Sequence, residues 1–309
     1  MTDGLEIADV AIAFGASRVV DGVSLSVPRG SVLGLVGESG SGKSMIALAC
    51  LGLVPRPGVV SGEIRIAGRN IVGLPERELR ALRGGEVGIV FQDPMTSLNP
   101  VRRIGALMAE TIRRHQGVPR QEALSIAERA LAEVGVPSPA ARLRAYAHEL
   151  SGGLRQRVMI AMALVNRPKI ILADEPTTAL DATIQAQILD LLRARVADAA
   201  AVLITHDLGV AATLCDRIAV IYSGRIVESG ATADILTAPR HPYTAGLLRA
   251  VPRFDPSRPR LLPIPGLPPR PDARPPGCAF APRCPRRVAR CDVERPALKG
   301  GLACWNPVA

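Results

Sequence analysis

The sequence has few aromatic residues and no long apolar run. Only 3% of its 309 residues are Phe, Trp or Tyr, whereas 48% are hydrophobic, so we expect an aliphatic core. The best apolar stretches, 47–54 and 158–165, are far shorter than the roughly 18 residues that span a membrane. We therefore expect membrane attachment only through partner proteins. The first residues lack the basic start and apolar run of a secretory signal, which predicts a cytosolic chain.

A net charge of +10 could indicate nucleic-acid binding, but most of it lies in the last 59 residues. Residues 251–309 contain eleven basic and four acidic residues, 14 of the 27 prolines and four of the six cysteines. This segment lacks the aromatic rings on which single-stranded nucleic acids stack, so we expect no nucleic-acid partner. The change in composition predicts a main domain over 1–250 and a separate extension over 251–309.

Within 1–250, short apolar runs alternate with segments of helical spacing. Residues 5–14, 31–36, 87–91, 170–173 and 202–205 read as strands, and 217–230 reads as a hairpin turning at Ser223-Gly224. Alternation of this kind favours an α/β fold with a largely parallel sheet. Residues 102–149, interrupted at 117–119 and 135–137, predict a helical insertion.

Residues 37–44 match the phosphate-loop pattern G-x-x-x-x-G-K-[ST] between an apolar strand and a helix that should begin at Lys43. In this motif backbone N–H groups converge on phosphate oxygens, Lys43 reaches the β and γ phosphates, and the Ser44 hydroxyl binds Mg²⁺. A flexible Gly-Ser turn is the alternative, but the pattern arises by chance in only about one chain in a hundred of this length. The predicted ATP contacts are Gly37, Ser39, Gly40, Gly42, Lys43 and Ser44.

Two acids follow the apolar run at 170–173. Because α/β sheets bind ligands at the carboxyl ends of their strands, Asp174 is predicted to hold Mg²⁺. Glu175 is placed to polarise the attacking water. A strand-end turn is the alternative, but the phosphate loop favours a site. Further along, Ser151-Gly152-Gly153 predicts either an anion-binding helix start or an ordinary serine cap.

Taken in order, the phosphate loop, Ser151-Gly152-Gly153, the Asp-Glu-Pro strand and Thr205-His206-Asp207 resemble the ATP-binding cassette (ABC) family over about residues 5–235. The resemblance implies a P-loop NTPase-type fold, with a RecA-like mixed sheet, an antiparallel β subdomain and a helical insertion near 92–150. It also implies a head-to-tail dimer with a second cassette. In that dimer the Ser151-Gly152-Gly153 signature of one chain contacts the γ phosphate held by Lys43 of the other.

The same resemblance assigns four further residues. His206 corresponds to the family's switch histidine near the γ phosphate, although a lone histidine after a strand is more often structural. Gln92 corresponds to the glutamine that senses Mg²⁺ and the γ phosphate, and Asp181 to the loop that crosses the dimer interface. Phe14 occupies the position of the adenine-stacking ring, with a plain core role as the alternative.

Residues 93–100 and 241–244 resemble the dipeptide and oligopeptide permease branch of importers. That branch implies two transmembrane permease subunits, whose coupling helices meet the segment beginning at Gln92, and an extracytoplasmic peptide-binding protein. The cassette would then lie peripherally on the cytoplasmic face of the inner membrane. His241 is expected to mark a helix start and to have no catalytic role.

The extension is too poor in apolar side chains to fold unaided, so its cysteines are expected to stabilise it. Cytosolic disulfides are uncommon, which favours a four-thiolate metal site, and the spacing alone does not choose the metal. The family resemblance implies a [4Fe-4S] cluster, with Zn²⁺ as the alternative. The proposed ligands are Cys278, Cys284, Cys291 and Cys304.

Together these features predict an ATP-hydrolysing importer subunit. Two alternatives stay open: a non-transport ABC ATPase of DNA repair or the ribosome, and an importer subunit for nickel chelates or glutathione. The chain has one cassette and no heptad run, which does not favour the first.

Overall fold

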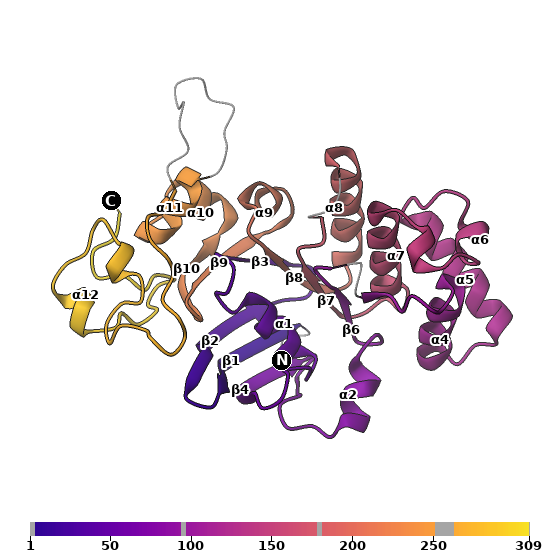
Figure 1. Cartoon of the computed structure of the whole chain (residues 1–309), viewed down its shortest axis with the longest axis horizontal. Coiled ribbons are helices and arrows are strands. Elements are labelled where there is room, and N and C mark those ends of the chain that lie inside the picture. The colour runs from indigo at the N-terminus through magenta and orange to yellow at the C-terminus, as the bar shows by residue number, and fades with distance from the viewer. Residues whose placement is uncertain (1–3, 94–96, 178–180, 251–262, 309) are drawn as a thin grey trace.

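The computed structural model describes residues 4–93, 97–177, 181–250 and 263–308. Two sheets form the centre of the molecule, a helical region lies at one end, and the C-terminal extension lies at the other (Figure 1). Pro94–Thr96, Ala179–Leu180 and 251–262, to which parts of the predicted motifs and extension belong, lie outside the described residues.

The larger sheet has six strands in the order β10-β9-β3-β8-β7-β6. Neighbours pair in parallel except β10 with β9, so the prediction of a largely parallel sheet is confirmed. The strands are β3 (Val32–Val36), β6 (Val87–Val90), β7 (Ile170–Asp174), β8 (Ala200–Thr205), β9 (Arg217–Tyr222) and β10 (Arg225–Ala231). Every residue of β3 and β7 is buried, as expected for parallel strands covered on both faces.

Two hydrophobic cores lie on the two faces of this sheet. Along β3, Val32 and Val36 pack into one core, whereas Leu33 and Leu35 pack into the other. The first core holds residues of α7 (Gly152–Leu164), α8 (Ala182–Val196), α9 (Leu208–Leu214), α10 (Thr232–Thr237) and α11 (Pro242–Ala250). The second holds residues of α1 (Lys43–Cys50), α2 (Glu76–Leu82) and the smaller sheet. The two cysteines outside the extension, Cys50 and Cys215, are buried in these cores.

The smaller sheet is antiparallel, with the order β2-β1-β4-β5. It contains β1 (Leu5–Phe14), β2 (Ser17–Val27), β4 (Val59–Ile66) and β5 (Arg69–Asn70). This sheet is the antiparallel subdomain that the family resemblance implied. Sequence periodicity identified only its first strand.

The helical region follows β6 and ends before α7. It consists of α4 (Ile104–Gln116), α5 (Arg120–Glu133), α6 (Pro139–Arg142) and the short helix η1 (Ala147–Glu149). Gly117, with φ 68°, ends α4 in the left-handed conformation that glycine tolerates. The predicted breaks at 117–119 and 135–137 therefore coincide with ends of helices.

The predicted hairpin is present, and its turn residues Ser223 and Gly224 both have positive φ. The extension that follows is mostly irregular, with only η2 (Ala281–Arg283) and α12 (Arg290–Val293) as regular elements in its described part. In the described residues, no helix is long and apolar enough to span a membrane.

Candidate nucleotide-binding site

The phosphate loop connects β3 to α1, and helix α1 begins at Lys43 as the sequence predicts. A side chain is excluded at Gly37, because an added Cβ would lie 2.2 Å from the carbonyl oxygen of Ile221. Gly40 and Gly42 have φ values of 76° and 102°, which favour glycine. The loop is also tied to the hairpin, since the Gly224 N–H donates to the carbonyl of Ser41 at 2.9 Å.

Lys43 is folded back against its own loop. Its Nζ donates to the carbonyl oxygens of Gly37, at 2.7 Å, and Glu38, at 3.0 Å. Burial lowers the pKa of Lys43, while the carboxylates of Glu175, Asp174 and Glu38 act in the opposite direction. These two neutral carbonyls can be exchanged for phosphate oxygens, which bind an ammonium more strongly.

Ser44 and Asp174 come together from α1 and the end of β7. The Ser44 hydroxyl hydrogen-bonds to the Asp174 carboxyl and lowers its pKa, but burial is the larger influence and raises it. A hydroxyl and a carboxylate are both oxygen ligands of the kind that Mg²⁺ prefers. The two residues predicted to bind magnesium therefore meet at the carboxyl end of the sheet.

Glu175 lies between the other two predicted catalytic side chains. Its Oε1 is 2.8 Å from His206 Nδ1, and its Oε2 accepts a hydrogen bond from Gln92 Nε2 at 3.1 Å. Glu175 is 9% exposed and has φ 48°, a conformation uncommon for a non-glycine residue. Three residues distant in sequence thus converge at the ends of β6, β7 and β8.

The remaining predicted contacts lie on the surface of the chain. Ser151 caps α7 by accepting from the N–H of Leu154 at 3.4 Å, and Asp181 caps α8 by accepting from the N–H of Ile184 at 3.0 Å. Ser151, Gly152 and Asp181 are exposed, Gly153 is half-buried, and an added Cβ at Gly152 would meet nothing within 4 Å. Within one chain these residues therefore serve as helix starts open to solvent.

Phe14 ends β1 and packs partly buried against the core between α1 and the antiparallel sheet. This position agrees with the alternative core role. Its edge also faces the backbone of Gly58, where an added Cβ would lie 2.8 Å from the ring.

The extension contacts the phosphate loop, which the sequence did not reveal. Arg283 of the extension pairs with the Glu38 carboxylate. On the main-domain side, the Tyr243 hydroxyl of α11 accepts the Glu38 N–H at 2.8 Å. The Glu38 position falls among the variable residues of the loop pattern, so no motif indicates its partner.

The four extension cysteines are free thiols that influence one another electrostatically. Burial, with smaller contributions from the charges of Cys291, Cys284 and Cys304, raises the pKa of Cys278 to about 11. Burial likewise raises the pKa values of Cys284 and Cys304. However, among the described residues no group of three or more His, Cys, Asp or Glu side chains is arranged to hold a metal ion. The expected [4Fe-4S] or Zn²⁺ site is thus not supported by this arrangement.

Two family models match the chain. Residues 20–178 match the ABC transporter family, and 227–291 match the C-terminal region of oligopeptide/dipeptide transporters. The oligopeptide transport ATP-binding protein OppD of Salmonella typhimurium strain LT2 is 46% identical over 98% of this chain and 94% of its own length. The dipeptide transport ATP-binding protein DppD of Escherichia coli K12 is 48% identical over 95% of this chain and 92% of its own length.

A solved dimeric structure of the ATP-binding cassette MJ0796, bound to ADP and Pi, has a TM-score of 0.65 and 28% identity. The match covers 74% of this chain and 98% of that one. Fold and site thus define a nucleotide-binding cassette of the P-loop type. The chain belongs to the ATP-binding subunits of the ABC transporter family, in its oligopeptide/dipeptide branch.

Proposed function

We propose that this chain is the ATP-hydrolysing subunit of a membrane importer of dipeptides or oligopeptides. The observation that carries the proposal is the convergence of Gln92, Glu175 and His206 beside Lys43 and the Ser44–Asp174 pair. The match of 227–291 to the C-terminal region of peptide transporters supports the cargo class. Dipeptides, longer peptides, glutathione and nickel chelates remain the cargo candidates.

Each site residue has a role in this proposal. The loop N–H groups and Lys43 bind the β and γ phosphates, and Ser44 and Asp174 hold Mg²⁺. Glu175 accepts a proton from the attacking water, His206 orients Glu175, and Gln92 connects Glu175 to the region of the γ phosphate.

The composite site would be completed by a second cassette. Ser151, Gly152 and Gly153 are accessible in the single chain, and Asp181 lies at the exposed start of α8. A second cassette, either a copy of this chain or a sister subunit, would place its own signature against the γ phosphate held here. The dimeric MJ0796 cassette supports this arrangement.

Two transmembrane permease subunits and an extracytoplasmic peptide-binding protein complete the proposed importer. The permease subunits would contact the segment of about 92–150 at the cytoplasmic face of the inner membrane. Co-purification of the permease subunits with the full chain tests this assembly. Replacing the exposed side chains of α4 and α5 should abolish that co-purification.

The four extension cysteines are proposed to hold a [4Fe-4S] cluster. Cys291 is buried and Cys278, Cys284 and Cys304 are half-buried. Partial burial raises the pKa values of these last three thiols, so forming their thiolates is costly. A metal centre would relieve this cost by binding the thiolates. Anaerobically purified protein should then contain about four iron atoms per chain and be brown. Colourless protein with one zinc per chain would contradict the cluster.

The hydrolytic role is tested by replacing Glu175 with Gln. Because the amide cannot accept the proton of the attacking water, we expect hydrolysis by the assembled transporter to fall at least about 100-fold while ATP affinity is retained. The matched control is Glu86→Gln, which alters a surface carboxylate paired with Lys169. Unchanged turnover in the Glu175 variant would remove it as the catalytic carboxylate.

A further inference from the structure

Glu38 is an acidic residue inside the phosphate loop, and a basic residue of the extension neutralises it. Arg283 Nη1 donates to Glu38 Oε2 at 2.7 Å, and Arg283 Nη2 donates to Oε1 at 2.9 Å. Two parallel hydrogen bonds of this kind form the strongest arrangement of an arginine and a carboxylate. The residues are 245 positions apart in the sequence.

Other residues of the extension hold the guanidinium of Arg283 in its position beside the loop. Its Nε donates to the carbonyl of Pro265 at 2.9 Å, and its Nη2 donates to that of Ile264 at 3.3 Å. The group also lies over the rings of Tyr222 and Phe280, with only 5% of the side chain exposed. The folded extension therefore determines where the charge of Arg283 lies.

Glu38 is held on its main chain as well. Its N–H donates to the hydroxyl of Tyr243, and its carbonyl oxygen accepts from Lys43 Nζ. The Glu38 charge also acts on Lys43, since it raises the pKa of that amine. Without Arg283, a bare carboxylate would compete with ATP for Lys43 and repel the phosphates.

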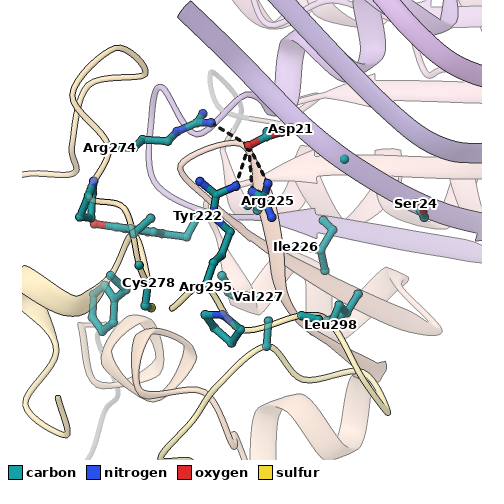
Figure 2. Close-up of a pocket in the computed structure, with 18 residues that line it drawn as sticks. Asp21, Ser24, Tyr222, Arg225, Ile226, Val227, Arg274, Cys278, Arg295 and Leu298 are labelled. Carbon is teal, nitrogen blue, oxygen red and sulfur yellow. Dashed lines mark hydrogen bonds and ion pairs between the residues drawn. The ribbon is translucent and has the colours of Figure 1, made fainter. Parts of the chain in front are cut away.

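A second contact anchors the extension to the cassette. Figure 2 shows Arg225 from β10 and Arg274 and Arg295 from the extension converging on Asp21 of β2, with distances of 2.7, 3.6 and 3.4 Å. Arg274 also donates to the Ser223 hydroxyl of the hairpin turn at 3.0 Å. These contacts hold the extension in place but do not include the phosphate loop.

We propose that Arg283 is a positioning residue for nucleotide binding, which neutralises Glu38 and so keeps Lys43 available to the phosphates. The inference rests on the proposed ATP site. It makes the affinity for ATP depend on the folded extension, because the carbonyls of Pro265 and Ile264 hold the Arg283 guanidinium in place.

The test is titration of the full chain with MgATP and MgADP. Arg283→Gln should weaken MgATP binding about tenfold, within the 5- to 150-fold range typical of coupled sites, and MgADP binding less. The double variant Glu38→Gln/Arg283→Gln should bind MgATP within about twofold of wild type, because the uncompensated charge is gone. Arg283→Lys, which keeps the charge but loses the paired hydrogen bonds, should weaken binding by a smaller factor.

Arg295→Gln is the matched control, since it removes an ion pair between extension and cassette at Asp21 and should leave the affinity unchanged. Wild-type affinity in Arg283→Gln would overturn the proposal, as would a double variant as weak as the single one. If Arg283→Gln does not fold, Arg283→Lys decides the matter: weakened MgATP binding by this variant supports the proposal, and wild-type affinity overturns it. Failure of the wild-type chain to bind MgATP, with Lys43→Ala no weaker, would instead refute the proposed function.

Discussion

Replacing His241 with Asn should remove an acid sensitivity that the folded chain carries. His241 is 1% exposed and directly precedes α11, where its Nδ1 accepts the N–H of Tyr243 at 3.0 Å. Its ring also packs against Phe280 of the extension, at 5.9 Å between ring centroids. Asparagine keeps the capping oxygen for the Tyr243 N–H but does not titrate.

The magnitude follows from the pKa of His241 in the two states. Burial lowers this pKa from 6.5 to about 4 in the folded chain. A depressed folded pKa means that the stabilisation is fully present above about pH 6.5 and is lost as the pH falls towards 4. Linkage gives a loss of about 2 kcal/mol between pH 7 and pH 5, approaching about 3 kcal/mol below pH 4.

The assay is urea unfolding of wild type and His241→Asn at pH 7 and pH 5. Acidic residues titrate in both proteins, so only the difference between the two unfolding free energies reports on His241. Relative to wild type, the variant should gain about 2 kcal/mol on acidification. A difference that is the same at both pH values would refute the assignment of His241 as a buried neutral group.

Two more substitutions test the site. Gly37→Ala should destabilise the chain by about 2 kcal/mol and abolish MgATP binding, because its Cβ would lie 2.2 Å from the Ile221 carbonyl; thermal melts and titrations measure both. Gly152→Ala, with nothing within 4 Å of the added carbon, should melt like wild type. Ser151→Arg should bind MgATP normally as an isolated chain, yet lose hydrolysis when the transporter is assembled, since Ser151 is exposed in the single chain. Loss of MgATP affinity in this last variant would contradict a contact made only in the dimer.

The sequence predicted the central sheet and the candidate nucleotide site because both follow local rules. The apolar run before Gly37 and the one before Asp174 each end at residues proposed to bind phosphate or Mg²⁺. Parallel strands then bring these ends together without further information.

The antiparallel sheet was harder to predict from periodicity. The pairing of β1 with β2 contains three register shifts, so the alternation of buried and exposed residues is broken along β2. The contact between Arg283 and Glu38 could not be predicted either, because it depends on how an irregular extension docks on the cassette. Residues 251–309 contain ten arginines, and nothing in the sequence indicates which of them pairs with Glu38.

The separation between Glu38 and Arg283 also has a consequence for synthesis of the protein. A ribosome adds residues from the N-terminus, and β3, the phosphate loop and α1 emerge early, whereas Tyr243 and Arg283 follow more than 200 residues later. Pairing of β3 with β8 and β9 must likewise wait for the second half of the chain. On the proposed role of Arg283, the nascent loop stays incomplete until the extension has left the ribosome, so we expect full ATP affinity only after the extension has folded.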